Sequence, residues 1–246
     1  MINETIYQFA ILSLLLLTVG LVIAVLLGLN YAFRRLHIPK LKRDLLVRYI
    51  GLGLTLWLTI LGILAHYEFF TNFDQLPSRF LVAVIPPIIL ILFLLQSRFF
   101  KLTLKAIPEK WLILIQSFRI LMELFLWMCF IGGFVPFQMT FEGFNQDIMI
   151  GITALMAGFF FFYKGRRQQT AAIYWNISGI ILLINIVIIS IISTPSPFRI
   201  FMNEPSNYFI ADFPFIWIPG FIVPFALAMH IFSIKQLIMN GKKISR

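Results

Sequence analysis

Three side chains that carry or share charge stand at helical spacing within an otherwise apolar stretch. Gln116, Arg119 and Glu123 are three and four residues apart, which places them on one face of a helix. Arg119 and Glu123 form an i, i+4 pair of opposite charge. A charge near the bilayer centre costs about 2.5–3.5 kcal/mol on insertion scales, so both should face protein and pair. Two interpretations remain open: a structural ion pair, or a point on the path of a substrate or proton.

Other polar residues within apolar stretches are further candidates. Asn185 lies in the stretch 171–193, and Asn176 lies on nearly the opposite face of the same predicted helix. Protein is therefore expected on both sides of that helix. His230, in the stretch 217–239, is expected near the depth of Arg119. A single histidine in a membrane helix usually serves as a hydrogen-bonding group, and a proton-linked switch is the alternative.

Two longer segments between apolar stretches are expected to cover one end of the molecule. Segment 136–147 mixes aromatic residues with Glu142, Asn145 and Asp147, and segment 194–217 is rich in proline. Both are too apolar and too stiffened by proline to be free linkers. We expect them to fold back over the bundle. The hypothetical ligand or ion pathway then comprises Gln116, Arg119, Glu123, Glu142, Asn145, Asp147, Asn185 and His230.

The elements that must position these residues are membrane-spanning helices. The chain is 60% hydrophobic and 12% charged, with a mean hydropathy of +0.93, whereas a soluble domain is about half apolar and a quarter charged. A spanning helix needs about 20 mostly apolar residues. We predict an all-α integral membrane protein, one transmembrane domain over residues 1–246, with seven helices at 6–33, 46–66, 80–95, 111–134, 148–163, 171–193 and 217–239. The third and fifth are short, and whether they span fully stays open.

The basic residues predict the orientation of this bundle. Of 20 Lys and Arg residues, 17 lie in segments 34–48, 98–110, 164–167 and 235–246, which alternate with segments that carry only Arg79 and Arg199. Short basic loops stay in the cytoplasm. The N-terminus is thus predicted outside and the C-terminus in the cytoplasm, in a multi-pass protein of the cell inner (plasma) membrane. The net charge of +10 is attributed to this topology and to anionic lipids at the cytoplasmic face, not to nucleic acid.

Prolines and small residues mark irregular places in the predicted helices. Pro86, Pro87, Pro219 and Pro224 fall inside the third and seventh stretches, where proline removes a helical hydrogen bond. Broken helices in matching positions can mark a transporter site, and ordinary kinks are the alternative. A stripe of Gly151, Ala154 and Gly158 predicts a close helix–helix seam.

Several chemistries find no support in the sequence. Covalent retinal needs a lysine midway along the last helix, and Lys235 is near the end of that helix. Nucleophile-elbow, zinc-protease and phosphate-loop motifs are absent, so enzymatic activity is not favoured and no catalytic residue, metal or other cofactor is assigned. A metal-dependent intramembrane enzyme is the least favoured alternative, with His66, Glu68 and the loop acids as its ligands.

Two local patterns resemble an uncharacterised bacterial inner-membrane family. They are Met-Thr-Phe-Glu-Gly-x-Asn-x-Asp-Ile at 139–148 and Phe-Pro-Phe-Ile-Trp-Ile-Pro at 213–219, followed by Val223-Pro224 and His230. The similarity runs from about residue 116 to residue 237. It implies a seven-helix membrane protein and no activity.

The predicted function is to bind or transport a small solute or lipid-like molecule through a cavity open to the outer face. The broken helices, the Arg119–Glu123 pair and the two covering segments motivate this hypothesis. The alternative is a structural subunit or assembly factor that contacts other membrane subunits.

Overall fold

The computed structural model describes residues 2–162 and 168–241, and over these residues it is helical with no strand. Within these described ranges, nine α-helices are joined by loops, short 3-10 turns and one π-helical segment. The α-helices are α1 Ile2–Arg35, α2 Lys40–His66, α3 Leu81–Gln96, α4 Arg98–Ala106, α5 Glu109–Leu114, α6 Phe118–Ile131, α7 Ile148–Phe160, α8 Gln169–Ser193 and α9 Val223–Gly241. The described residues also form the 3-10 turns η1 Ile115–Ser117, η2 Phe137–Met139 and η4 Phe209–Ala211 and the π-segment η5 Ile218–Ile222.

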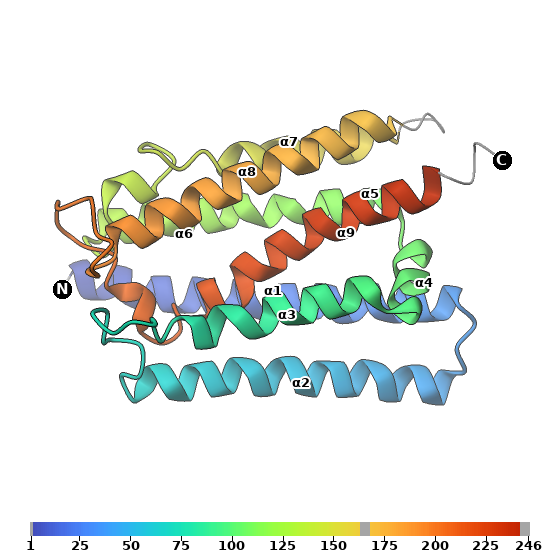
Figure 1. Cartoon of the computed structure of the whole chain (residues 1–246), viewed down its shortest axis with the longest axis horizontal. Coiled ribbons are helices and arrows are strands. Elements are labelled where there is room, and N and C mark those ends of the chain that lie inside the picture. Colours follow the sequence, from blue (N-terminus) through green and yellow to red (C-terminus); the bar gives the residue numbers. More distant parts are fainter. Residues whose placement is uncertain (1, 163–167, 242–246) are drawn as a thin grey trace.

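Most helices run along the long axis of the molecule and reverse direction from one to the next (Figure 1). The segment α5–η1–α6 forms one continuous column, and α4 lies across the bundle at the end where α9 finishes. α9 packs against α8, α5, α4 and α3. Of the most apolar 18-residue stretch in the helix Ile218–Gly241, 61% is buried inside the protein, whereas the corresponding share for α2 is 17%. α9 is thus the central helix, and α2 lies at the periphery.

Five helices are long and apolar enough to cross a membrane: α1, α2, α5–α6, α8 and η5–α9. α3 becomes a sixth only if it is counted together with α4, from which it is bent by 85°. α7 has 13 residues, or about 20 Å at 1.5 Å per residue, which is less than the roughly 30 Å hydrocarbon core. The predicted seven spans and the orientation are therefore not confirmed, and the predicted end of the fifth span at residue 163 lies outside the described residues.

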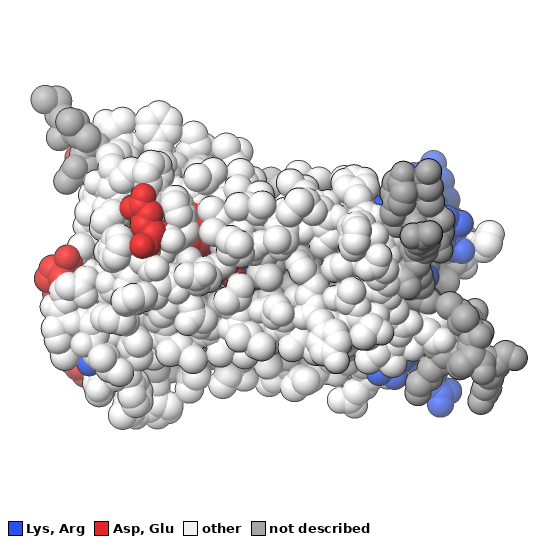
Figure 2. All heavy atoms as spheres, turned by 90° about the horizontal axis from the view of Figure 1, so that it is seen from above, with Lys and Arg blue, Asp and Glu red and all other residues white. Residues whose placement is uncertain are grey.

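The two ends of the molecule differ in charge. Figure 2 shows acidic side chains at the end that holds the N-terminus and basic ones at the opposite end, with a largely uncharged band between them. Arg34 and Arg35 close α1, and α4 adds Arg98, Lys101 and Lys105. Lys164, Arg166, Arg167, Lys242, Lys243 and Arg246, which the sequence assigns to the basic side, lie outside the described residues.

The proline-containing break before α9 is compensated by a neighbouring helix. Pro224 has no N–H for the carbonyl of Gly220 four residues before it, and the chain forms the π-segment η5 at this place. The indole Nε1 of Trp57 in α2 donates to the Gly220 oxygen at 2.9 Å. Trp217 returns a similar bond to the Leu58 carbonyl at 2.9 Å. The freed carbonyl is satisfied by protein, so this break is a structural joint between α2 and α9.

Replacing Trp57 with phenylalanine is expected to lower the free energy of unfolding by about 1–3 kcal/mol, because it removes the hydrogen bond from the indole to the buried Gly220 carbonyl. Pro224→Ala restores a backbone N–H that can reach this carbonyl. The loss caused by Trp57→Phe should therefore shrink in the Pro224→Ala background. Denaturant unfolding of the four proteins of this cycle measures the coupling. Equal losses in both backgrounds would show that the indole bond does not compensate the proline.

The predicted small-residue seam on α7 is present. A methyl group built on Gly151 would lie 2.8 Å from the backbone nitrogen of Ile120 in α6, and one on Gly158 would overlap the Leu114 side chain of α5. The glycines let α7 approach the α5–α6 column at backbone distance, and this approach places the N-terminal end of α7 beside Arg119.

Candidate functional site

A buried charged network lies where α6 meets the N-terminal end of α7. Gln116, Arg119 and Glu123 are each at most 1% exposed, as their common helical face predicts. Arg119 is ten residues after Glu109 and twelve before Ile131 in this column, so it lies about 15 and 18 Å along the axis from the two ends. The network is therefore near the middle of the span.

Arg119 forms its ion pair with Asp147, not with Glu123. The Nη1 atom of Arg119 lies 2.8 Å from Oδ1 of Asp147, and both side chains are buried. The predicted pairing of Arg119 with Glu123 was wrong because the guanidinium reaches across the close α6–α7 seam to the residue that starts α7. Nη1 has a second, longer contact of 3.5 Å with the Gly179 carbonyl of α8.

Asn145 connects the remaining parts of this network. Its Nδ2 donates to both carboxylate oxygens of Glu123 at 2.7 Å and to the Met139 carbonyl at 3.1 Å. Its Oδ1 accepts from the backbone N–H of Asp147 at 3.0 Å. One fully buried amide thus holds Glu123, turns the chain into α7 and positions Asp147 for Arg119. Segment 136–147 supplies these residues and is part of the core at this point.

His230 belongs to a neighbouring polar cluster between α8 and α9. Its Nδ1 lies 2.9 Å from Oδ1 of Asn176, and Nδ2 of Asn176 donates to Ser233 at 3.0 Å. Nε2 of the fully buried His230 has no hydrogen-bond partner among the described residues. A methyl group on Gly179 would overlap the His230 ring. Gly179 therefore lies between the two clusters, since its Cα faces His230 and its carbonyl oxygen accepts from Arg119.

The other predicted pathway residues lie apart from this centre. Asn185 donates to the Phe144 carbonyl at 2.9 Å and so fastens segment 136–147 to α8. Glu142 is exposed at the surface of that segment. Gln116 is buried and donates to the Ala226 carbonyl of α9 at 3.0 Å. The structure thus brings together four of the eight predicted residues, Arg119, Glu123, Asn145 and Asp147, and places Gln116, Glu142, Asn185 and His230 elsewhere.

Asn176, Ser233 and Gly179 were not among the predicted site residues. The available signal was Asn176, a strong polar group inside an apolar stretch, which in lipid must find a partner on another helix. Its distance in sequence from His230 gave no reason to join them. Gly179 had no signal, because its role depends on the approach of the α9 histidine.

A cavity of about 390 Å³ begins at the charged network. Its wall is formed by α3, α6, α8 and η5–α9 and is mostly apolar, with Val84, Met122, Leu183, Val187 and Ile222 among its residues. Arg119, Glu123 and Asp147 are its charged lining residues. The volume falls in the range of about 300–1,000 Å³ typical of small-molecule sites.

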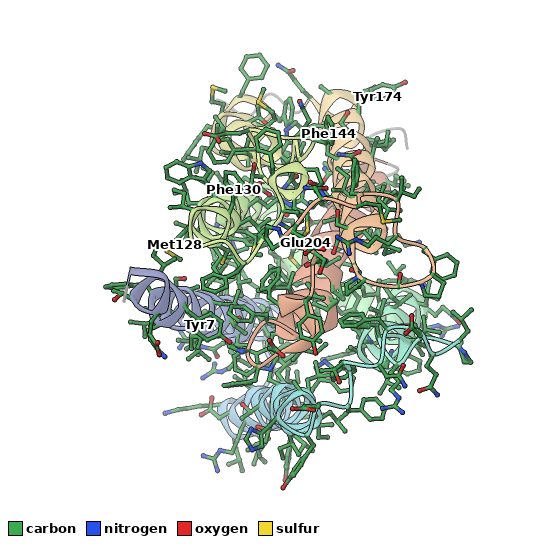
Figure 3. All side chains as sticks on the ribbon, turned by 90° about the vertical axis from the view of Figure 1, so that its left-hand side faces the viewer. Tyr7, Met128, Phe130, Phe144, Tyr174 and Glu204 are labelled. Atoms are coloured by element: carbon green, nitrogen blue, oxygen red, sulfur yellow. The ribbon has the colours of Figure 1, made fainter. Side chains whose placement is uncertain are left out.

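Several residues that line the cavity are exposed at the surface of the protein. Leu81 of α3 and Ile191 of α8 line the cavity and are 43% and 49% exposed. Phe198, from the loop that follows α8, lines it as well, and this loop extends from α8 toward α3 (Figure 3). In a bilayer, the exposed sides of α3 and α8 would face lipid.

Hydrogen bonds hold the covering loops in place. Gln138 donates to Ser193 at 3.0 Å and accepts from Asn203 at 2.9 Å, which joins the two predicted covering segments. Arg199 donates to Glu204 at 2.9 Å, and this bond holds the pKa of Glu204 below its usual value. Figure 3 labels Glu204 on this loop, at the end of the bundle. The segments fold back over the bundle, as predicted.

Asp212, in the segment before η5, makes the stability depend on pH. Partial burial and the charge of Glu68 raise its pKa above 3.8. The folded chain then binds this proton more tightly than the unfolded chain, so stability falls as the pH rises from 3.8 through the raised value. Asp212→Asn is expected to flatten this part of the curve and to raise the unfolding midpoint at neutral pH. Thermal unfolding between pH 4 and 8 tests it, with exposed Glu142→Gln as the control that keeps the wild-type slope.

The described residues contain no group of three or more His, Cys, Asp and Glu side chains placed to hold a metal ion. His66 and Glu68, the residues of the metal alternative, lie at the end of α2. Cys129 is buried in α6 as a free thiol.

These observations define the class of protein: an all-helical chain with several helices that are long and apolar enough to cross a membrane. Within this class, the chain belongs to the family of a domain of unknown function, DUF8737, whose model matches residues 76–238. This agrees with the resemblance to an uncharacterised family, and the match shows neither a bacterial origin nor a seven-helix fold. No curated protein and no solved structure matches the chain.

Proposed function

We propose that this protein binds a lipid-like molecule in the cavity between α3 and α8. One observation carries the proposal: a mostly apolar cavity ends at a charged side chain that has unused donors. Arg119 lines the cavity and is 1% exposed. Its Nε and Nη2 atoms have no hydrogen-bond partner among the described residues. Buried donors left without an acceptor are costly, and a ligand with an apolar body and a polar group satisfies both parts of the site.

The test is whether lipid-like molecules that copurify with the protein depend on the cavity. Val187 of α8 lines the cavity, and the adjacent Ile188 is 51% exposed on the outside of the same helix. Val187→Trp fills the cavity, whereas Ile188→Trp adds the same bulk toward lipid. Extraction and mass spectrometry should find a molecule in the wild type and in Ile188→Trp that is lost in Val187→Trp. The proposal fails if all three proteins retain the same molecules in the same amounts.

For this role we propose that the protein is a seven-helix bundle in the cell inner membrane. The proposed orientation has the N-terminus outside and the C-terminus in the cytoplasm. It is supported by the separation of charge between the two ends (Figure 2) and by the tendency of basic loops to stay in the cytoplasm. Glu142→Cys and Lys101→Cys, made in a Cys129→Ser background, test it. An impermeant maleimide added to intact cells should label only the Glu142→Cys protein.

The second candidate function, a structural subunit or assembly factor, is favoured by the periphery of the bundle. Among the five helices long and apolar enough to cross a membrane, α2 has the smallest share of its apolar stretch buried inside the protein. Its exposed side carries Thr55 and Thr59. Small hydroxyl residues are common where membrane helices pack. Purification in mild detergent tests this candidate, which requires a stoichiometric protein partner that is lost when both threonines are replaced by leucine.

A further inference from the structure

We infer that the ligand is an uncharged lipid whose carbonyl oxygen accepts hydrogen bonds from Arg119. The inference rests on the proposed function and names the chemical class of its ligand. A long-chain ester and a long-chain quinone share the required chemistry: an apolar body and a neutral carbonyl acceptor. A phospholipid and a fatty anion lack the neutral head.

The unused hydrogen-bonding atoms of the cavity determine that the ligand must accept. Nε and Nη2 of Arg119 are donors only, and they are buried without a partner among the described residues. The carboxylate of Glu123, by contrast, already accepts from Asn145 through both oxygens. Asp147 accepts from Arg119 itself. A ligand whose polar group only donates, such as an ammonium group, would therefore leave these donors of Arg119 without an acceptor.

The formal charge of the network argues against an anionic head. Arg119 carries one positive charge, and Asp147 and Glu123 carry one negative charge each when ionised. Their sum is −1, or zero when one carboxyl group is protonated. An anion would bring the buried total to −2 or −1 in a region of low dielectric, where uncompensated charge is expensive. A neutral carbonyl adds hydrogen bonds and leaves the total unchanged.

The position of Arg119 along the α5–η1–α6 column also favours an uncharged carbonyl lipid as the ligand. It lies about 15 Å or more along the helix axis from either end of the α5–η1–α6 column, which has Glu109 and Ile131 at its ends. A phospholipid keeps its head at the bilayer surface, so its phosphate would have to leave water to reach this point. Uncharged carbonyl lipids dissolve within the hydrocarbon, and the cavity-lining residues Leu81 and Ile191 are exposed on helices α3 and α8, where such lipids can reach them.

Four probes of matched length separate these possibilities. The protein is reconstituted in phosphatidylcholine nanodiscs and titrated with methyl palmitate, a long-chain benzoquinone, hexadecanesulfonate or hexadecane. The shift of the thermal unfolding midpoint with probe mole fraction gives the affinity. The ester, the quinone or both should bind at least about tenfold more tightly than hexadecane, as charge-assisted hydrogen bonds of this kind allow. Hexadecanesulfonate should bind no more tightly than hexadecane.

Variants test whether Arg119 is the group that recognises the carbonyl. Arg119→Met combined with Asp147→Asn removes the donors and keeps the formal charge of the network at −1, and it should reduce the ester and quinone affinities to that of hexadecane. Arg119→Lys keeps the charge and loses the fork of N–H groups, and it should reduce the advantage partly. This single variant serves if the double variant does not fold. Ile188→Trp should bind as the wild type does, and Val187→Trp should bind none of the probes.

Several outcomes would overturn the inference. They are tighter binding of the sulfonate than of both carbonyl probes, equal binding of the carbonyl probes and hexadecane, and unchanged affinities after both Arg119 substitutions. Each leaves the proposed function intact if Val187→Trp still abolishes binding. If Val187→Trp binds the probes as the wild type does, or if no probe binds, the cavity is not a ligand site and both proposals fail together.

Discussion

Replacing Asp147 with alanine is expected to lower the free energy of unfolding by about 3–5 kcal/mol, because it leaves Arg119 as an unpaired buried charge. The ion pair is 2.8 Å long and its side chains are only 2% and 8% exposed. Asp147 is also the N-cap residue of α7, and its backbone N–H donates to Oδ1 of Asn145. Unfolding in mixed detergent and sodium dodecyl sulfate micelles, followed by tryptophan fluorescence, measures the loss.

Two controls separate the charge effect from a general effect of the loop. Glu142→Ala removes an exposed acid of the same segment and should change the free energy of unfolding by no more than about 0.5 kcal/mol. Adding Arg119→Met to Asp147→Ala removes the stranded cation and should recover a large part of the loss. A double variant as unstable as Asp147→Ala would show that packing at α7, rather than the unpaired charge, causes the loss.

Helix positions and burial could be predicted well because lipid leaves few alternatives. Continuous apolar stretches must satisfy their backbone groups internally, so the helices appear close to where the hydropathy places them. The burial of Arg119 and Glu123 follows from the same reasoning, since the cost of exposing a charge to hydrocarbon is independent of tertiary detail. The joint at Pro224 was likewise visible as a broken helix.

The partners of the buried groups could not be predicted, because they depend on which helices meet. An i, i+4 rule selects Glu123 for Arg119, and the actual partner, Asp147, is 28 residues away. It becomes available only when α7 docks on α6 through Gly151. The pairing of His230 with Asn176 depends in the same way on the α8–α9 contact. Local spacing carries no information on either event.

The end of the third apolar stretch shows a different limit. The sequence predicts a basic loop over segment 98–110, and the structure forms α4 there, bent by 85° from α3. The signal was present: Ser97 accepts from the Phe100 N–H as a helix cap, and Arg98, Lys101 and Lys105 recur at helical spacing. A short amphipathic helix at the bilayer surface shows this pattern, but high positive charge alone also describes a loop.

Gly151→Ala is expected to lower the free energy of unfolding by about 1–3 kcal/mol, the usual cost of added volume in a packed seam. The new methyl group would lie 2.8 Å from the backbone nitrogen of Ile120, and a backbone atom cannot move aside as the end of a side chain can. The substitution should also weaken the Arg119–Asp147 pair, because α7 must retreat from α6.

Gly53→Ala on α2 is the matched control, since nothing lies within 4 Å of its new methyl group. Helix propensity alone then makes Gly53→Ala neutral or stabilising by up to about 1 kcal/mol. The same unfolding measurement compares the two, and a Gly151→Ala protein as stable as Gly53→Ala would show that the α6–α7 distance does not depend on this glycine.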